Sequence, residues 1–385
     1  MNLAETLAAL SNKLTAIENS ITEDKGHLDH PEDLIFLGGT AGAARALNAI
    51  VATAKNPKTV TIKWDGYPAL IFGRDGNQQF SIMDKHMFNK KDGTGRAVYS
   101  PEQFRKYDLA RGVDRSDLHR LVAEIWPGLD KATSSADGYF WGDLLFSKPL
   151  QDQNGSYVFK ANPNGITYTV VADSDLGKLM SGKTAGVAVH QHIATDAPTT
   201  DSATPLNGTI GELQNNSNVA IIPSAMPSSP TIKLDGNLVK DVQSSISKYG
   251  SAVDQLMDTS PQARNTFNQL FTTYINKRIV SGDLTNLVNG FTEYFQSRPM
   301  SDDMAFKISD HLQQNKNGLI GAFTIWVAIY KLKMSIVDQL NQAAKESPVK
   351  GNLDDGTETH EGFVSNGLKF VDRMGFSRQN LAGRT

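Results

Sequence analysis

The sequence contains no cysteine. This absence excludes disulfide bonds, thiolate metal ligands and a cysteine nucleophile, and it is typical of a cytoplasmic protein. An excess of one charge is also missing, because 38 Lys and Arg residues face 41 Asp and Glu residues and the net charge is −3. Overall charge therefore gives no reason to expect a polyanionic partner.

A long hydrophobic run is missing as well. The most apolar stretch, residues 319–330, ends at Lys331 and Lys333, and it is shorter than the roughly 20 residues that span a bilayer. The first 20 residues contain early acidic residues and polar breaks, unlike a signal peptide. These absences predict a buried helix at 319–330, no membrane association and a cytoplasmic location.

The order of sequence patterns predicts an α+β protein of one large or two modest domains. Helices are expected from the spacing of apolar residues at 1–20, at 41–54, near 102–125 and within 242–345. Strands are expected from short β-rich runs between 60 and 193, at 219–225, at 231–237 and at 360–373. The predicted divisions are an N-terminal helical segment (1–58), a β-rich domain (59–241), a helical insert (242–345) and the final strands and tail of the β-rich domain (346–385).

Positive charge is locally concentrated although the whole chain is nearly neutral. Residues 84–120 carry nine Lys and Arg residues against six acidic ones, and residues 366–385 carry four against one. A basic patch suits a phosphate backbone, but a solvated face is the commoner explanation. Charge alone leaves both interpretations open.

One short stretch carries a chemical signal. In "TVTIKWDGYPALIFGR", residues 59–74, two apolar runs flank a turn that contains Lys63, Asp65 and Gly66. The lysine is either a solvated hairpin residue or a nucleophile. The pattern K-x-D-G is weak by itself, because "KLDG" at 233–236 matches equally well and an aspartate beside a glycine is common in turns.

Three further stretches add charged residues to the β-rich sequence. Asp143 lies within "GYFWGDLLF", Glu361 within "HEGFV" and Lys369 within the strand-like "GLKFVDR". A lysine among apolar neighbours loses hydration unless an anion meets it. Two lysines and two carboxylates together suit a nucleoside triphosphate with a divalent metal ion.

The order of these four motifs resembles that of the covalent nucleotidyltransferases, which include ATP-dependent DNA and RNA ligases and mRNA capping enzymes. The stretches "HLDHPEDLIF", "IKWDG", "GDLLF" and "DSDLG" are also similar to proteins of tailed bacteriophages. The resemblance implies a ligase-type fold of mostly antiparallel sheets with flanking helices. It further implies ATP and Mg²⁺ as cofactors, nucleic acid as partner and, for a phage protein, the cytoplasm of the bacterial host.

Carried onto this sequence, the resemblance implies a covalent lysyl–AMP intermediate. Lys63 would attack the α-phosphorus of ATP, and Lys369 would neutralise the charge that builds on that phosphate. Asp143 and Glu361 would hold the metal ion. The residues implied to bind the nucleotide are Ile62, Asp65, Gly66, Lys85, Asp143, His190 and Glu361.

Departures from the family pattern keep other readings open. Pro68 stands where ligases usually have arginine, and Asp143 is shorter than the usual glutamate. The chain ends soon after Lys369, without room for the C-terminal barrel of DNA ligases and capping enzymes, which favours an RNA ligase over a capping-type guanylyltransferase. The rival class is a non-catalytic nucleic-acid-binding or virion-associated protein on a degenerate ligase fold. Lys233 stays an alternative nucleophile, and His190 and His192 are either structural or part of a metal site.

Overall fold

A computed structural model describes residues 28–377 apart from several internal gaps. The gaps are 91–93, 162–164, 196–197, 207–209, 211–212, 214–217, 225, 227–229, 259–260, 299–300, 354–355 and 357–361. The helix predicted at 1–20 and the predicted site residue Glu361 lie outside the described residues. The described chain divides into two compact units, of which unit 2 contains residues 58–229 and 341–363 and unit 1 contains the rest.

Unit 2 is built around a mainly antiparallel sheet, which has six strands in the described part of the chain and the order β3-β2-β4-β7-β8, with β9 beside β7. Among the pairings described in this sheet, only that of β7 with β9 is parallel. The central strand β4 is buried on both faces because it is rich in aromatic and aliphatic residues. The strands are β2 (Ala69–Arg74), β3 (Phe80–Met83), β4 (Gly138–Phe146), β7 (Ala185–Ile193), β8 (Thr204–Pro205) and β9 (Val219–Pro223).

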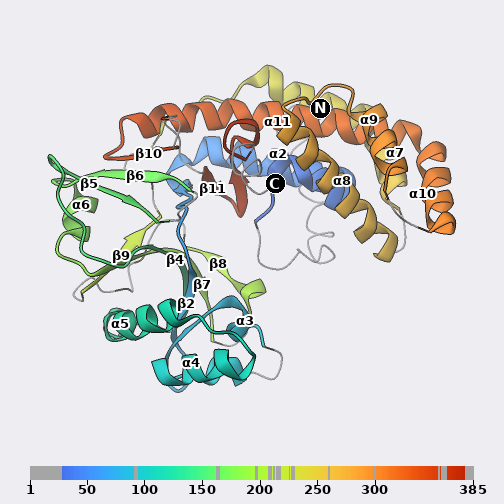
Figure 1. Cartoon of the computed structure of the whole chain (residues 1–385). Coiled ribbons are helices and arrows are strands. Elements are labelled where there is room, and N and C mark those ends of the chain that lie inside the picture. Colours follow the sequence, from blue (N-terminus) through green and yellow to red (C-terminus); the bar gives the residue numbers. More distant parts are fainter. Residues whose placement is uncertain are drawn as a thin grey trace. The chain divides into compact units, whose positions relative to one another are not determined.

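Helices cover this sheet, and a second antiparallel sheet lies in the same unit (Figure 1). The amphipathic helix α5 packs its apolar face on β2, β3 and β9. The second sheet has the order β10-β6-β5. Its strands are β5 (Ser156–Lys160), β6 (Thr167–Val171) and β10 (Val349–Asn352); the remaining elements of the unit are β1 (Thr61–Ile62), α3 (Lys85–Phe88), α4 (Pro101–Ala110), α5 (Ser116–Ala132) and α6 (Asp175–Met180).

Unit 1 is mostly helical and has an aromatic core. The ring of Phe271 stacks on Phe36 and on Phe291, each at 4.6 Å between centroids, and Phe323 meets all three rings edge-on or at a steep tilt. The elements are α2 (Leu34–Lys55), α7 (Gly236–Met257), α8 (Pro261–Ser281), α9 (Leu287–Gln296), α10 (Asp302–Gln314) and β12 (Leu368–Phe370), while α11 (Lys316–Lys345) and β11 (Phe363–Ser365) each cross a border between the units.

The α+β class is confirmed, and most expected strands are present where the sequence predicted them. The strand expected at 231–237 was wrong: Asp235 instead accepts hydrogen bonds from the N–H groups of Asn237 and Leu238 and caps α7. The single helix expected near 102–125 is two helices, α4 and α5, separated at Gly112, whose φ of +77° favours glycine.

The units also group the chain differently from the predicted divisions. The segment from α7 to α11 shares its core with α2, because Phe36 of α2 stacks on Phe271 of α8. Residues from Val364 onward join this same unit, whereas β10 joins the second sheet of unit 2. The helical segment is therefore not a self-contained insert in this structure.

Two described helices are long and apolar enough to cross a membrane by length and composition. They are residues Pro31–Lys55, which include α2, and α11. Within the protein, 67% and 56% of their apolar windows are buried. Burial of this kind is also typical of core helices, as α11 shows at Phe323 and Trp326, which are 2% and 0% exposed.

Candidate functional site

The K-x-D-G turn of residues 63–66 lies directly against strand β4. A Cβ atom on Gly66 would come within 2.6 Å of the Asp143 Cβ and 2.8 Å of the Leu144 carbonyl oxygen, so only glycine fits here. The N–H of Tyr67 donates to the Leu144 carbonyl at 2.9 Å, and the N–H of Leu144 donates to the Pro68 carbonyl at 3.1 Å. The structure thus places the predicted residues Gly66 and Asp143 side by side.

Backbone hydrogen bonds hold the lysine at the start of this turn. The N–H of Lys63 donates to the carbonyl of Gly362 at 2.9 Å, and the N–H of Ile62 donates to that of Ser224 at 2.7 Å. Ile62 is buried and Lys63 is partly exposed. Gly362 is the first described residue after Glu361, which itself lies outside the described residues.

Asp65 is occupied by structural hydrogen bonds. Its N–H donates to the Tyr168 hydroxyl at 2.7 Å, and its Oδ2 accepts from the Ile166 N–H at 3.2 Å. Trp64 packs on the same tyrosine, with ring centroids 4.9 Å apart. These contacts hold the turn against Ile166 and β6, and the predicted contact of Asp65 with a nucleotide stays a prediction.

Four polar or aromatic side chains, carried by β4, β7 and α3, lie close to one another. His190 Nε2 lies 3.4 Å from Asp143 Oδ2, and its ring centroid lies 5.8 Å from that of Trp141. Lys85 Nζ lies 5.8 Å from the Trp141 ring centroid on the α3 side. The cluster of Lys85, Trp141, Asp143 and His190 combines two cationic or titratable groups, a carboxylate and an aromatic ring.

A β-bulge brings His190 into this cluster. Strand β7 pairs Gln191 with Trp141 but Val189 with Gly142, so His190 is the extra residue. In a regular ladder His190 would pair with Gly142 and face away from Asp143, because successive side chains alternate between the faces. His192 instead lies near Phe140 and contacts the Asp137 carbonyl at 2.8 Å, so the two histidines occupy different environments.

Trp141 was not among the site residues predicted from the sequence. Trp141 and Asp143 are two positions apart in a strand, and residues at this spacing share one face. The pattern W-x-D in "GYFWGDLLF" was therefore the available signal. Among the described residues, no group of three or more His, Asp or Glu side chains is assembled as a metal site.

Comparison with protein families identifies a match over nearly the whole chain. A family model covers residues 25–384. The chain belongs to DUF6267. DUF6267 is described as a family of unknown function. No curated protein and no solved structure matches the chain.

The other two predicted lysines of this DUF6267 chain lie in unit 1. Lys369 is the middle residue of β12, between the buried Leu368 and Phe370, and its N–H donates to the Asp29 carbonyl at 2.9 Å. The backbone N–H and carbonyl of Lys233 are both bonded to the side chain of Gln339. The second K-x-D-G is thus explained by a helix cap, and a role for Lys369 stays a prediction.

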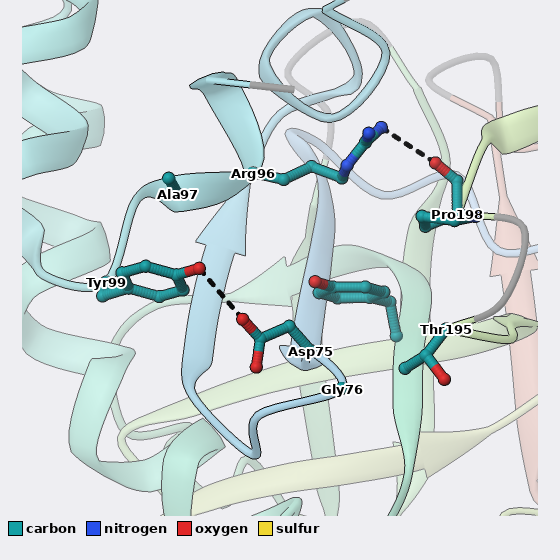
Figure 2. Close-up of a pocket in the computed structure, with 8 residues that line it drawn as sticks. Asp75, Gly76, Arg96, Ala97, Tyr99, Thr195 and Pro198 are labelled. Atoms are coloured by element: carbon teal, nitrogen blue, oxygen red, sulfur yellow. Dashed lines mark hydrogen bonds between the residues drawn. The ribbon is translucent and has the colours of Figure 1, made fainter. Parts of the chain in front are cut away.

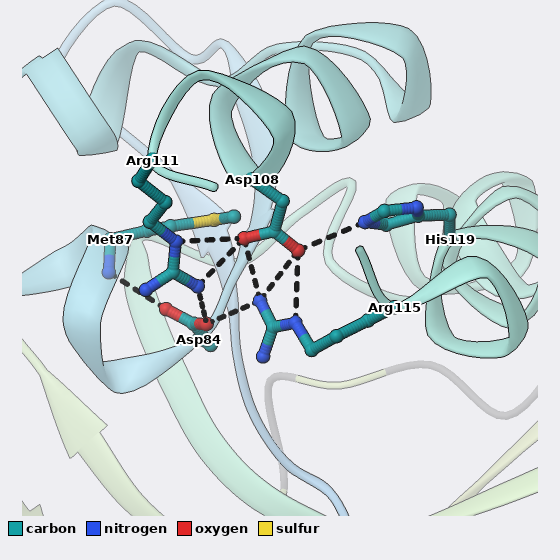
Figure 3. A network of polar contacts seen from close by, with 6 residues as sticks. All are labelled: Asp84, Met87, Asp108, Arg111, Arg115 and His119. Atoms are coloured by element: carbon teal, nitrogen blue, oxygen red, sulfur yellow. Dashed lines mark hydrogen bonds and ion pairs between the residues drawn. The ribbon is translucent and has the colours of Figure 1, made fainter. Parts of the chain in front are cut away.

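Part of the basic stretch in the DUF6267 chain is neutralised internally (Figure 3). Arg111 and Arg115 each contact the carboxylates of Asp84 and Asp108 at 2.7–3.1 Å. His119 Nε2 lies 2.9 Å from the fully buried Asp108. Burial raises the pKa of Asp108, but hydrogen bonds from Arg115, His119 and Arg111 outweigh it and lower that pKa overall. Arg111 and Arg115 therefore form structural ion pairs that stabilise the fold around Asp108.

Replacing Asp108 by asparagine is expected to destabilise the protein by about 2 kcal/mol at neutral pH, because three charged or polar donors lose their anion. A carboxyl group with a lowered folded-state pKa stabilises above its unfolded value of about 3.9, and the contribution is lost as the pH falls through the lower folded value. Asp108→Asn should therefore weaken the acid dependence of the urea midpoint below about pH 4. An unchanged acid dependence would contradict this role.

Proposed function

We propose that this chain is an ATP-dependent polynucleotide ligase that works through a lysyl–AMP intermediate, with RNA as the preferred polynucleotide. The observation that carries the proposal is that the K-x-D-G turn packs on β4, with Gly66 in contact with Asp143. This packing brings together two motifs that are 77 residues apart in the sequence. Their order also matches that of the covalent nucleotidyltransferases.

The proposed reaction has three chemical steps. The neutral Lys63 amine attacks the α-phosphorus of ATP and loses one proton to solvent as the P–N bond forms, while the bond to the β-phosphate breaks and releases pyrophosphate. The AMP group then passes to a 5′-phosphate end, and a 3′-hydroxyl displaces AMP to join the strands. Lys85, whose Nζ lies over the Trp141 ring, supplies positive charge near Asp143, two residues further along the same strand.

Asp143 and Glu361 are the proposed ligands of Mg²⁺, an ion that prefers carboxylate oxygens and water. The Asp143 side chain is 23% exposed and its recorded ion pair is with the partly exposed His190, so its oxygens suit a hydrated ion. Bound Mg²⁺ supplies charge neutralisation at the phosphates.

The proposal is tested by incubating the protein with Mg²⁺ and ATP labelled in either the α- or the γ-phosphate, followed by a denaturing gel. Label from the α-phosphate alone should stay with the protein. α-Labelled GTP serves as a second arm, because labelling by GTP and not ATP would indicate a guanylyltransferase. Absence of any covalent label with either nucleotide would favour the non-catalytic nucleic-acid-binding class.

Lys369→Ala is expected to fold normally but to lower the rate of adenylylation by about 100-fold, the scale expected when one charge-stabilising group is removed. The buried neighbours Leu368 and Phe370 are untouched, so the strand should be preserved. Circular dichroism checks the fold, and single-turnover labelling measures the rate. Full activity of Lys369→Met would show that the charge of Lys369 has no part in the reaction.

A further inference from the structure

Residues 84–120 keep an excess of positive charge when their internal ion pairs are set aside. Arg111 and Arg115 are neutralised by Asp84 and Asp108. Of the nine Lys and Arg residues and six acidic residues in this stretch, seven cationic and four acidic residues then remain. The structural ion pairs therefore do not account for the positive charge of this stretch, and three more cations than anions are left in a chain whose net charge is −3.

Contacts at both ends fix the short helix α3 in this stretch. Asp84 caps the helix by accepting from the Met87 N–H at 2.7 Å, and its other oxygen is held by two arginines (Figure 3). At the other end, Arg96 Nη1 donates to the carbonyls of Phe88 and Pro198, both at 3.0 Å, and Figure 2 shows the bond to Pro198. Arg96 thus holds the end of α3, and the side chains on this helix have defined positions.

Basic side chains on α3 and just after it lie against two aromatic rings. Lys85 Nζ lies 5.8 Å from the ring centroid of Trp141. The ring of His86 lies 6.3 Å from that of Tyr107, and Lys90 Nζ lies 5.1 Å from the same Tyr107 centroid. Such contacts hold the cationic ends in place, so less side-chain freedom is lost when they bind an anion. These five residues are called the α3 strip.

The α3 strip begins beside the candidate site and leads away from it. Trp141 lies two residues before Asp143 on β4, whereas Tyr107 lies on α4. Apart from Trp141, the side chains of the strip are exposed or partly exposed, so a ligand in solution reaches their polar ends. A row of basic groups matches the successive phosphates of a strand better than one compact anion. The partly exposed ring of Tyr107 also suits stacking on an unpaired base, which a duplex does not offer.

We propose that the α3 strip binds the phosphate backbone of a single-stranded polynucleotide, with His86 and Lys90 contacting phosphates beyond the one nearest Lys85. Both residues are donors to a phosphate oxygen, because a histidine ring has an N–H in either protonation state. The proposal rests on the proposed function for one point, that the end of the strand lies towards Asp143. Binding by the strip itself requires neither ATP nor Mg²⁺.

The test measures the fluorescence anisotropy of a labelled single-stranded RNA oligonucleotide with the full chain, without ATP and with EDTA present, over a series of salt concentrations. Lys90→Gln keeps the length of the side chain and removes its charge. It should weaken binding by about threefold to tenfold and reduce the slope of log affinity against log salt by about 0.7, the value for one phosphate contact on a single strand. His86→Ala, at an exposed position, should also weaken binding.

Lys178→Gln is the matched control because it makes the same change of residue and charge in the same unit. Lys178 lies on α6, which packs on β6 and β9 and lies apart from α3 (Figure 1). Its side chain is exposed and pairs with the exposed Asp173. Lys178→Gln should leave both the affinity and the salt slope as in the wild type.

A duplex of the same sequence distinguishes a single-strand site from general attraction to polyanions, and the single strand should bind at least about fivefold more tightly. Equal binding of the duplex, absence of salt-dependent binding, or equal losses in Lys90→Gln and Lys178→Gln would overturn the proposal. Lys90-dependent binding by a protein that forms no lysyl–AMP adduct would reject the ligase chemistry and retain the α3 strip. An adduct without Lys90-dependent binding would do the reverse.

Discussion

Lys63→Ala is expected to abolish covalent labelling by α-labelled ATP, while Lys233→Ala keeps it. The amine of Lys63 is the proposed nucleophile, so its removal takes away the nitrogen that forms the P–N bond. The turn of Lys63 packs on β4 beside Asp143, whereas the turn of Lys233 leads into the N-terminal cap of α7. A denaturing gel with equal protein loads measures the label.

Lys233→Ala is the matched control because it changes the same residue type in the same K-x-D-G pattern. The Lys233 side chain is exposed, and the recorded bonds of this residue to Gln339 use backbone atoms. The substitution should therefore leave α7 in place. Label that survives in Lys63→Ala and disappears in Lys233→Ala would reverse the assignment.

The second large effect is expected in a buried ion network of unit 1. Lys333 Nζ donates to Glu32 Oε1 at 2.7 Å, and both side chains are fully buried. Arg373 Nη1 donates to both oxygens of Asp33 at 2.9 and 3.0 Å, and Trp326 Nε1 donates to the same carboxylate at 2.8 Å. This network joins the helical turn just before α2 (Pro31–Asp33), the middle of α11 and the turn that begins at Arg373 (Arg373–Ser377) within one core.

Lys333→Met is expected to reduce the free energy of unfolding by about 3–5 kcal/mol, because it leaves the Glu32 carboxylate buried with Arg373 at 3.4 Å as its remaining ion-pair partner. Urea denaturation measures the loss. Burial lowers the pKa of Lys333, so the charged form depends on its partner Glu32. The double substitution Glu32→Gln with Lys333→Met should recover part of the loss, since both charges are removed together.

Lys331→Met is the control for this prediction. Lys331 lies two residues away on the same helix and is exposed, so its replacement should change the stability by no more than about 0.5 kcal/mol. An unchanged urea midpoint for Lys333→Met would show that the network does not stabilise unit 1. Equal destabilisation by both single substitutions would indicate a general effect on α11.

The strands of unit 2 could be predicted because their local sequence decides them. Runs such as "ALIFGR" and "GYFWGDLLF" place aromatic and aliphatic residues between turn residues, and the structure has β2 and β4 there. The expected strand at 231–237 failed because Asp235 is a better helix cap than strand residue. The grouping of α2 with α7–α11 could not be predicted, since an amphipathic helix does not specify which partner covers its apolar face.

The candidate site was predicted in part. Motif order singled out Lys63, Gly66 and Asp143, and the packing of Gly66 on Asp143 brings the two motifs together. The bulge at His190 could not be predicted from the sequence, because a one-residue shift in register reverses the face of a side chain without changing the sequence pattern. Net charge within 84–120 likewise did not reveal that Arg111 and Arg115 face buried carboxylates.

The most direct test of the proposed chemistry is to locate the adduct. The full chain is incubated with ATP and Mg²⁺, digested with a protease, and its peptides are sequenced by tandem mass spectrometry. An AMP group on the side chain of Lys63, and on no other lysine, is the predicted result. An unmodified Lys63 peptide, or AMP found on Lys233, Lys369 or another residue, would contradict Lys63 as the nucleophile.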